Sequence, residues 1–512
     1  MKPVAAAWAA IACCVAVLAG CGGPRPAVVD PGQDSSIDYA SASAARAHFP
    51  ESDWLRFDYD AQRSGVGPVD TGITAHNVNH LRLRTVSLPG TVDSSAIELA
   101  GVTVHGRKRD VIVVTTTYGN TLALDPGSGR RLWEFTPADI RSYLGSSQFT
   151  TATPIADPDR KFIYAASPDG RIHKLALATG REIHAGGWPV SVTFDPTHEK
   201  IAAALNISGS SLIVTTGGYL GDPPPYQGHV VLINRGSGRI TAVWNSLCSD
   251  RHRLIDPPRS CPGSDAAIWA RAGAVIEPGT SRILVATGNA PFNGSTDWGD
   301  SVLELSPDAS TLLHNWTPTD QAHLNSTDTD LGSTAPAILP NFDGRRLAVQ
   351  GGKAGVLDVL DLDRLDGTNG GPGGRLGGQI QELPAPGGAQ VFTAPAVWSH
   401  NGRIWVFVGD GSGTWAYTLG GSGAGPRLSV AWRSGNGGTS PVIAGGLLYV
   451  YDPGGSLDVY EPTTGRRLAS LPAGSGHWNS PIVVGGRVIL PVGNANDDST
   501  SGTLDIYHLP GR

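Results

Sequence analysis

One short pattern recurs along this chain: a strand of alternating apolar residues ends in a tight glycine turn, and a new strand follows. A clear copy runs from Thr121 to Leu124, turns at Asp125–Gly129 and continues through Trp133. Alternation with a period of two residues is typical of β-strands and not of helices. The last apolar residue of each strand marks eight copies, at Leu124, Leu175, Ile233, Leu305, Leu360, Tyr417, Tyr460 and Tyr507.

The spacing of these copies predicts the fold. Neighbouring copies lie 43 to 72 residues apart, and four short strands with their turns need roughly 40–50 residues, the period of a propeller blade. Leucine-rich repeats are shorter, at about 20–29 residues. We therefore expect an eight-bladed β-propeller of four-stranded antiparallel blades over residues 51–512, with seven blades as the alternative. A small residue followed by proline precedes most copies, where an inner strand would begin: Thr153-Pro154, Ala335-Pro336, Ala394-Pro395, Ser440-Pro441 and Ser480-Pro481.

Composition supports a single large β domain. The chain has 68 Gly and 38 Pro among 512 residues, one Met, and only 16% charged residues. Turn-forming residues recur between short Val, Ile, Leu and Thr runs, as expected for an all-β unit. The formal net charge is −7, which argues against a nucleic-acid partner.

The N-terminus predicts export and a lipid anchor. Lys2 precedes an apolar run from Val4 to Leu18, which is typical of a secretory signal and too short to span a bilayer. The run ends in Leu18-Ala19-Gly20-Cys21, which resembles a bacterial lipobox. We expect a signal peptide over 1–20, lipidation at Cys21 and a flexible tether over 21–50. The protein would then be extracytoplasmic, attached to the bacterial cell membrane or outer membrane; the alternative is an ordinary signal peptide with a chance cysteine.

Cysteine usage agrees with an oxidising compartment. Cys13 and Cys14 lie in the signal and Cys21 would carry lipid, so Cys248 and Cys261 remain. One such pair in an exported protein is most simply a disulfide that closes a surface loop. The chain contains no Cys-x-x-Cys, which argues against a metal site and against covalently attached haem.

The repeat resembles that of the PQQ-dependent quinoprotein dehydrogenases. Their repeats carry an Asp-x-x-Thr/Ser-Gly turn with a following Trp, as at Asp125–Trp133. The N-terminal segment is also similar, with Trp54, then Asp60–Gly65, then Asn77–Leu81. The resemblance covers roughly Trp54 to the end and implies the propeller fold. The same repeat occurs in non-enzymatic assembly lipoproteins, so function has to be inferred from the site.

Three residues match positions that bind the cofactor in that family. The segment Ile283–Phe292 is similar to the one that carries a calcium-ligating Asn, which implies a metal ligand at Asn289. Ile268-Trp269 resembles the segment that supplies a Trp stacked on PQQ. Gly351–Gly355 looks like the strand whose Lys contacts the quinone, here Lys353. The alternatives from the residues alone are turn capping for Asn289, blade packing for Trp269 and a solvated charge for Lys353.

Two other positions depart from the family pattern. The calcium-ligating Glu falls at Tyr219, whose neutral phenol is a poor ligand for a hard cation. The catalytic Asp falls at Ser306, which lacks a carboxylate to accept a proton. Asp308, Asp328 and Asp330 lie nearby in sequence and are candidate substitutes, with Asp328 and Asp330 the candidate catalytic residues. The alternative is that these carboxylates accept backbone N–H groups in a turn.

These substitutions divide the functional hypotheses. The first is a surface lipoprotein whose propeller face binds a protein, glycan or small-molecule ligand, with a degenerate quinoprotein site. The second is an alcohol dehydrogenase dependent on PQQ and Ca²⁺ that passes electrons to a separate acceptor. Because the metal and base positions are altered, we favour the binding or assembly module, and PQQ and Ca²⁺ remain possible cofactors.

Overall fold

The computed structural model describes residues 53–366, 376–421 and 425–510. Every described residue belongs to one compact unit. The predicted signal peptide, Cys21 and most of the tether therefore lie outside the described residues. Among the helices that the structure describes, none is both long enough and apolar enough to span a bilayer.

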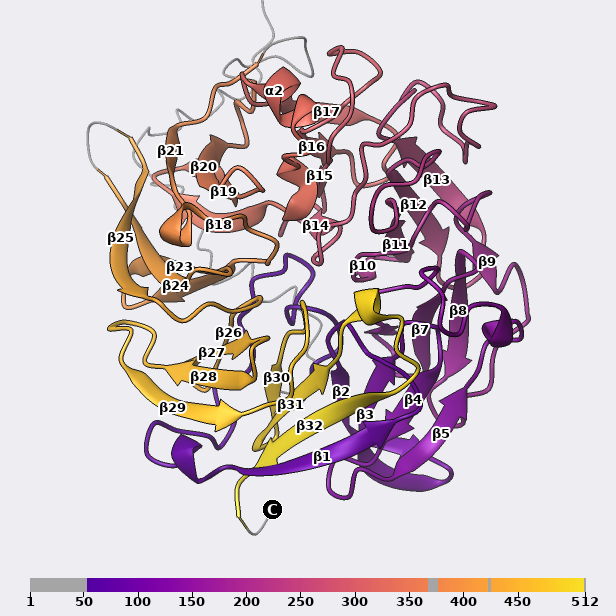
Figure 1. Cartoon of the computed structure of the whole chain (residues 1–512), viewed down its shortest axis with the longest axis vertical. Helices are drawn as coiled ribbons and strands as arrows, with labels where there is room; N and C mark the ends of the chain where they lie inside the picture. Colours follow the sequence, from indigo (N-terminus) through magenta and orange to yellow (C-terminus); the bar gives the residue numbers. More distant parts are fainter. Residues whose placement is uncertain (1–52, 367–375, 422–424, 511–512) are drawn as a thin grey trace, which may run out of the picture. The chain divides into compact units, whose positions relative to one another are not determined.

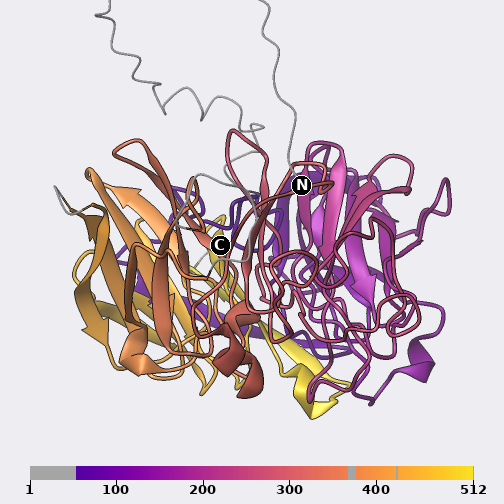
Figure 2. The ribbon, with the colours of Figure 1, turned by 90° about the horizontal axis from the view of Figure 1, so that it is seen from above.

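Eight four-stranded antiparallel sheets form a ring, which confirms the predicted eight-bladed propeller (Figure 1). Each of the eight apolar anchors lies on or beside the third strand of a different blade, so the sequence repeat and the blade coincide. Figure 2 shows the ring edge-on, with strands running between its two faces. Helical structure is sparse among the described residues: α2 (Gln321–Ser326) and the 3-10 turns η2 (Val78–His80), η3 (Ile140–Ser142), η4 (Leu331–Ser333), η5 (Pro386–Gly388) and η6 (Ala495–Asp497).

The strands follow one another blade by blade. Blade 1 contains β2 (Ile97–Val104), β3 (Arg107–Thr115), β4 (Thr121–Leu124) and β5 (Arg131–Phe135), and blade 2 contains β6 (Ile155–Ala156), β7 (Phe162–Ser167), β8 (Arg171–Ala176) and β9 (Val190–Ser191). Blade 3 contains β10 (Asn206–Ser208), β11 (Ser211–Thr215), β12 (His229–Asn234) and β13 (Ile240–Asn245), and blade 4 contains β14 (Val275–Ile276), β15 (Ile283–Ala286), β16 (Val302–Leu305) and β17 (Leu312–Trp316). Blade 5 contains β18 (Ala337–Phe342), β19 (Arg345–Gln350), β20 (Val356–Asp361) and β21 (Gln381–Pro384), and blade 6 contains β22 (Ala396–His400), β23 (Arg403–Gly409), β24 (Thr414–Gly420) and β25 (Arg427–Ser434). Blade 7 contains β26 (Val442–Ala444), β27 (Leu447–Asp452), β28 (Ser456–Tyr460) and β29 (Arg467–Pro472), and blade 8 contains β30 (Ile482–Val484), β31 (Arg487–Val492), β32 (Gly502–His508) and β1 (Arg82–Leu88).

The antiparallel order gives the ring two different faces. Connections between blades and between second and third strands lie at one end, here called the loop face. The short turns between first and second strands and between third and fourth strands lie at the other end, the turn face. Loops on a rigid scaffold commonly carry function, so the loop face is where a site is expected.

The ring closes by pairing distant parts of the chain. β1 is the outer strand of blade 8, where Arg82 pairs with His508 and Leu88 with Gly502. The Thr85 hydroxyl also donates to the Asp505 carboxylate at 2.7 Å. Blade 8 is therefore built from the start and the end of the propeller, which removes an open sheet edge from the ring.

Tryptophans of outer strands lock neighbouring blades together. The Trp133 indole donates to the Leu177 carbonyl at 2.8 Å, and its ring lies against Gly180, where a Cβ would approach it to 2.6 Å. Trp432 of blade 6 makes the same two contacts with blade 7, at Pro462 and Gly465. Gly180 and Gly465 also have positive φ, so glycine is required in these turns for space and for backbone conformation.

The proline steps mark an inner ring of hydrogen bonds between blades. The Ser480 hydroxyl donates to the Ser440 carbonyl at 3.1 Å, and the Ser95 hydroxyl donates to the Ser480 carbonyl at 3.1 Å. The Thr153 hydroxyl accepts from the Ser95 N–H at 3.1 Å. Small hydroxyl residues thus satisfy the backbone groups where the first strands crowd together.

The segment before β1 holds the first strands of five blades. Trp54, Leu55, Ala61, Ser64 and Gly65 exchange backbone hydrogen bonds with them, at Glu98, Ala156, Ile276, Val397 and Ile443. Arg63 donates to four backbone carbonyls and is buried. The hydrophobic core itself lies between neighbouring blades, as in the cluster that joins Trp133 and Phe135 to Ile163 and Leu175.

Candidate functional site

The predicted site residues of blades 4 and 5 converge on the loop face. Trp269 lies in the segment that leads into β14, and Asn289 lies in the loop after β15. Lys353 follows β19, and Asp328 and Asp330 precede β18. We call these five side chains the Trp269 cluster.

Lys353 is the centre of the cluster. Its ammonium nitrogen lies 2.6 Å from Asp330 Oδ2 and 3.1 Å from Asp328 Oδ1. The same nitrogen lies 5.8 Å from the centroid of the Trp269 ring, within the range of a cation–π contact. Burial, the largest single effect, lowers the pKa of Lys353, but the charges and hydrogen bonds of Asp330 and Asp328 together outweigh it and raise that pKa. Lys353 is thus a paired and partly buried ammonium, not a solvated charge.

Asn289 ties the two aspartates to the neighbouring blade. Its backbone N–H donates to Asp330 Oδ1 at 2.8 Å, and its side-chain amide donates to Asp328 Oδ1 at 2.9 Å. Asn289 Oδ1 is buried and meets no donor among the described residues. Asp328 and Asp330 therefore bridge two blades, rather than cap a local turn. Gly288 is required here, because a Cβ would approach Asp330 Oδ1 to 2.3 Å.

The surroundings of the cluster are rich in carboxyl groups. Burial, with a smaller contribution from the nearby charge of Asp330, raises the pKa of Asp300 to about 8, so Asp300 keeps its proton at neutral pH. Burial also raises the pKa values of Asp222 and Asp265, with Asp330 again adding to the effect. The positive charge of Lys353 is therefore supported mainly by its ion pairs with Asp328 and Asp330.

Tyr219 makes its contacts outside the Trp269 cluster. Its hydroxyl donates to the Pro196 carbonyl at 2.9 Å, and its ring meets Phe149 edge-on with centroids 6.0 Å apart. Burial raises the pKa of Tyr219 well above its ordinary value. This side chain is thus a neutral phenol that cannot take the role of an anionic metal ligand.

Ser306 corrects one expectation drawn from the resemblance. β15 and β16 run antiparallel, so Asn289 after β15 lies on the loop face and Ser306 after β16 lies on the turn face. Ser306 is half-buried, and its hydroxyl donates to Asp308 Oδ1 at 2.6 Å. Its assignment as the position of the base was wrong, because a residue at the other end of the blade does not reach the Trp269 cluster. Asp308 accepts from the Ser310 N–H at 3.1 Å, as the turn interpretation predicts.

An aromatic row extends from Trp269 through Phe392, which sequence reasoning did not single out. The Phe392 ring lies 6.0 Å from that of Trp269 and 4.9 Å from that of Trp478. His477 lies beside Trp478 and pairs with Asp93 at 2.9 Å. Phe392 and Trp478 each come a few residues before a proline step. This position before a proline step could have identified both residues, because each such segment leads from the loop face into an inner strand.

Solved structures share this backbone. The chain is similar to a quinohemoprotein alcohol dehydrogenase from Comamonas testosteroni, with a TM-score of 0.65 and 16% identity over 92% of this chain and 84% of that one. It is similar to the quinohemoprotein alcohol dehydrogenase ADHIIG from Pseudomonas putida HK5, with a TM-score of 0.66 and 14% identity over 94% and 82%. A europium-containing methanol dehydrogenase gives a TM-score of 0.64 and 15% identity over 90% and 98%.

The fold is that of the quinoprotein dehydrogenases. No family model matches the chain, and no curated protein sequence matches it. At this low identity the likeness to quinoprotein dehydrogenases establishes the fold, whereas the activity depends on the residues of the site.

A calcium ion does not fit the quinoprotein position in this chain. Over the described ranges, no group of three or more His, Cys, Asp or Glu side chains is placed to hold a metal ion. The Lys353 ammonium already occupies the space between Asp328 and Asp330, where a divalent cation would meet a like charge. Trp269 and Lys353, the two expected quinone contacts, do lie side by side.

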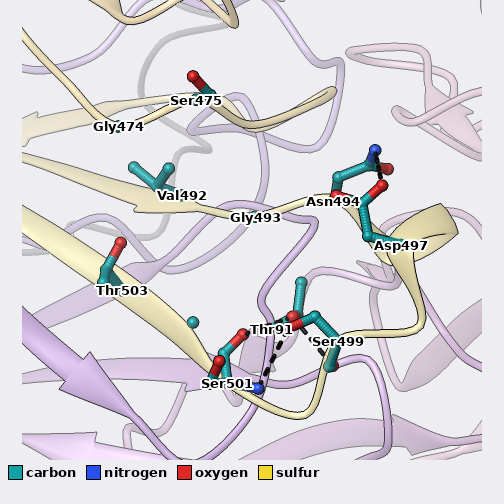
Figure 3. Close-up of a pocket in the computed structure, with 11 residues that line it drawn as sticks. Thr91, Gly474, Ser475, Val492, Gly493, Asn494, Asp497, Ser499, Ser501 and Thr503 are labelled. Atoms are coloured by element: carbon teal, nitrogen blue, oxygen red, sulfur yellow. Dashed lines mark hydrogen bonds between the residues drawn. The ribbon is translucent and has the colours of Figure 1, made fainter. Parts of the chain in front are cut away.

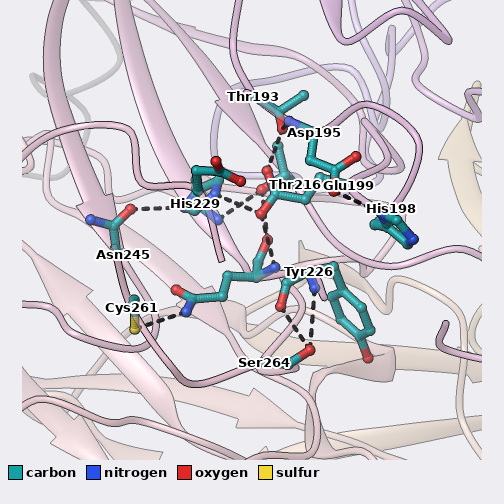
Figure 4. Close-up of polar contacts among 12 residues, drawn as sticks. Thr193, Asp195, His198, Glu199, Thr216, Tyr226, His229, Asn245, Cys261 and Ser264 are labelled. Carbon is teal, nitrogen blue, oxygen red and sulfur yellow. Dashed lines mark hydrogen bonds and ion pairs between the residues drawn. The ribbon is translucent and has the colours of Figure 1, made fainter. Parts of the chain in front are cut away.

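A buried polar network supports the loops beside the cluster (Figure 4). His229 and Glu199 are fully buried, with His229 Nε2 3.0 Å from Glu199 Oε1. His229 Nδ1 lies 2.8 Å from Asn245 Oδ1. The amide of Gln227 donates to Cys261 Sγ at 3.0 Å, and Cys261 forms the predicted disulfide with Cys248. The network therefore fastens the disulfide loop to blade 3.

A separate cavity lies on the loop face near the closure of the ring (Figure 3). Its volume is about 280 Å³ and it shares no residue with the Trp269 cluster. Hydroxyl, amide and glycine residues dominate its wall: Thr91, Gly474, Ser475, Val492, Gly493, Asn494, Asp497, Ser499, Ser501, Gly502 and Thr503. The Thr91 hydroxyl is already used, because it donates to the carbonyls of Ser499 and Ser501.

Proposed function

We propose that this protein is a lipid-anchored, extracytoplasmic propeller that binds a ligand at the Trp269 cluster and does not oxidise it. The observation that carries this proposal is the pairing of Lys353 with both Asp328 and Asp330. A general base for alcohol oxidation needs a carboxylate free to accept a proton. Here both carboxylates are ion-paired with the lysine, and both accept further hydrogen bonds from Asn289.

The chemistry of the cluster favours a ligand with one flat apolar face and several hydroxyl groups, and a sugar ring is the simplest example. Trp269 and Phe392 offer ring surfaces, which bind such faces through area burial. The Asp328 side chain is 71% exposed, so its carboxylate can accept hydrogen bonds from hydroxyl groups. Of the partner classes that a propeller face takes, a glycan fits this combination better than an apolar protein surface does.

Titration calorimetry with a panel of oligosaccharides tests the binding role. We expect Trp269→Ala to abolish binding by the mature protein, because it removes the stacking surface. Trp398→Ala is the matched control, since Trp398 stacks on His400 in β22, toward the turn face. Equal binding by the two variants would place the ligand elsewhere and contradict the proposal.

The alternative function is a PQQ- and Ca²⁺-dependent alcohol dehydrogenase that uses a separate electron acceptor. The observation that favours it is that Trp269, Lys353 and Asp330 lie together. Reconstitution of the purified protein with PQQ and Ca²⁺, followed by absorbance and dye-linked alcohol oxidation, separates the two functions. We expect no turnover; robust turnover that is lost in Asp328→Asn or Asp330→Asn would establish the dehydrogenase.

A further inference from the structure

The cavity of Figure 3 has a wall made mostly of hydrogen-bonding groups and glycines. Val492 is the one purely apolar side chain among the described residues that line it. The volume of about 280 Å³ corresponds to roughly nine water molecules at about 30 Å³ each. A single sugar ring suits a space of this size and chemistry, because hydroxyl groups cover most of its edge.

The wall is held in place by hydrogen bonds of its own. The Asn494 amide donates to Asp497 Oδ1 at 3.0 Å, and Asn494 Oδ1 accepts a backbone N–H two residues further on at 3.1 Å. Across the cavity, the Thr91 hydroxyl donates to the carbonyls of Ser499 and Ser501. Because these groups are already ordered, a ligand that meets them does not have to fix them on binding.

The charge of the wall selects the class of ligand. Asp497 is the one charged residue among those that line the cavity, and it is exposed. Asn494 uses its Oδ1, so its other carboxylate oxygen is open to a ligand hydroxyl, which makes a strong, charge-assisted hydrogen bond. Asp498 adds a second negative charge next to it. Carboxylate or phosphate ligands are therefore disfavoured, and a neutral sugar is favoured.

Asp93 joins three of the segments that form the cavity. It is buried and lies two residues after Thr91. Its carboxylate accepts from the Ala495 N–H at 3.0 Å and pairs with His477 at 2.9 Å. His477 in turn lies two residues after Ser475, which lines the cavity. The cavity and the segment that carries His477 are thus held together by one buried carboxylate.

The same segment carries the last ring of the aromatic row. Trp478 follows Ser475 by three residues, a stretch of chain at most about 11 Å long. From Trp478 the row leads through Phe392 to Trp269, with ring centroids 4.9 and 6.0 Å apart. All three rings are half-buried, so each keeps some surface in contact with solvent. A chain of sugars that lies on Trp269 can therefore continue along the row toward the cavity.

We propose that the cavity is a second subsite of the ligand site at the Trp269 cluster, and that it holds one neutral sugar residue of a longer chain. This inference rests on the proposed function and adds the size and charge of the ligand: a neutral oligosaccharide of several residues. The aromatic row supplies apolar contact, and the cavity supplies hydrogen bonds. Because one chain links the two subsites, the cavity adds affinity only for chains long enough to reach it.

Calorimetry with cellobiose and cellotetraose tests the proposal, since both are neutral and present flat apolar sugar faces. We expect the mature protein to bind cellotetraose at least about tenfold more tightly than cellobiose. Asp497→Asn should weaken cellotetraose binding about tenfold, because it replaces a charge-assisted hydrogen bond by a neutral one. Cellobiose binding should not change, which also shows that the variant is folded.

Asp498→Asn is the matched control. It removes the same charge one residue away and outside the cavity wall, and asparagine tolerates the φ of +49° at this position. This variant should bind both sugars as the unmodified protein does. Equal weakening by the two variants would show a general charge effect and overturn the proposal. Hydrogen exchange gives the location: cellotetraose should slow exchange in residues 493–503, and cellobiose should not.

The outcomes separate this inference from the proposed function. Cellotetraose binding that is lost in Trp269→Ala but unchanged in Asp497→Asn would overturn the second subsite and leave the ligand site at the Trp269 cluster standing. Equal affinity of the unmodified protein for the two sugars would do the same. Binding of neither sugar, or equal binding by Trp269→Ala, would overturn the second subsite together with glucan binding at the Trp269 cluster.

Discussion

The charge state of His229 follows from its two neighbours. The side-chain amide of Asn245 donates to the carbonyls of Arg251 and Arg253, so Asn245 Oδ1 faces His229 as an acceptor. Glu199 accepts at the other ring nitrogen. Both ring nitrogens then have to donate, which requires the imidazolium form. Burial, the largest single effect, opposes this form, but the charge and hydrogen bond of Glu199 and the hydrogen bond of Asn245 together outweigh it and raise the pKa of His229.

We expect His229→Gln to lower the free energy of unfolding by about 3–5 kcal/mol, because it leaves Glu199 as an unpaired buried charge. A pKa that is raised on folding contributes stability that is complete below the ordinary histidine value of about 6.5. That stability is lost as pH rises through the folded value. Urea unfolding should therefore show the largest difference between wild type and variant at low pH.

The double variant Glu199→Gln with His229→Gln is the control for this prediction. It removes both charges and leaves two neutral amides in place of the ion pair, so it should cost less than the single change. A difference in stability that does not change between pH 5 and pH 9 would show that His229 is neutral in the folded protein.

Single residues of the site were predictable where local context identifies them. Trp269, Asn289 and Lys353 each stand in a short segment that is similar to a family motif, and the structure brings them together. Phe392 was missed because no motif surrounds it. Ser306 was misplaced because a position counted along the chain ignores that antiparallel strands alternate between the faces. The pairing of Glu199 with His229 joins residues 30 positions apart, and no local pattern signals it.

At the scale of elements, the disulfide loop is a connection between two blades that is held by its own contacts. It joins β13 of blade 3 to β14 of blade 4 and holds Cys248 and Cys261, which are 13 residues apart. A cluster of buried side chains, Leu247, Ile255, Cys261, Ala266 and Ala290, packs beneath it. The loop therefore has a small core of its own, separate from the contacts between blades.

We expect the paired change Cys248→Ala with Cys261→Ala to loosen this loop and leave the ring intact. Chain entropy suggests a local contribution of roughly 3 kcal/mol for a loop of this length. Hydrogen exchange should rise over residues 247–263 and in Gln227, whose amide contacts Cys261, whereas β2–β4 should exchange as before. Free-thiol labelling of the unmodified protein is the control, and two reactive thiols without reductant would refute the bond.

The elements themselves were largely predictable, because third strands carry regular alternation and end at glycine turns. First strands were not predicted as strands by their pattern. β6 and β14 contain only two residues each, too few to show a period. The position of β6 was visible only from the Thr153-Pro154 step, and no proline step precedes β14. Tertiary contacts, not local propensity, form these short strands.

At the scale of the whole molecule, one contact between the two ends of the ring adds to the pairing of β1 with β32. Val86 of β1 lies against Gly129 in blade 1, where a Cβ would approach Val86 Cγ2 to 2.4 Å. Gly129 has a φ of +72°. Gly129 thus corresponds to the glycines that pack against a tryptophan in other blades, and Val86 stands in the place of that tryptophan.

We expect Gly129→Val to destabilise the ring more than Gly106→Val does. Gly106 also has a φ of +72°, yet a Cβ there meets nothing within 4 Å. Both changes carry the same backbone strain, so their difference isolates the overlap with Val86, about 1–3 kcal/mol. Urea unfolding measures both, and equal losses would mean that Val86 moves aside without cost.

The proposed anchor is tested by Cys21→Ala. This change should release the protein from the membrane fraction or block its processing, because each buried CH₂ of the attached lipid contributes about 0.8 kcal/mol to membrane binding. Fractionation followed by immunoblotting provides the measurement. Unchanged membrane retention with normal signal cleavage would rule out lipidation at this residue.

The closing strand also sets an order of events. Thr85 and Asp505, which meet in blade 8, stand 420 residues apart. A chain that emerges with its N-terminus first exposes β1 early and supplies its partner β32 last. Until then β1 presents unpaired backbone groups that another nascent copy can pair with. Ring closure therefore requires the chain to be synthesised through β32. A product terminated before β32 stays open, and proteases and chaperones can distinguish it from the closed ring.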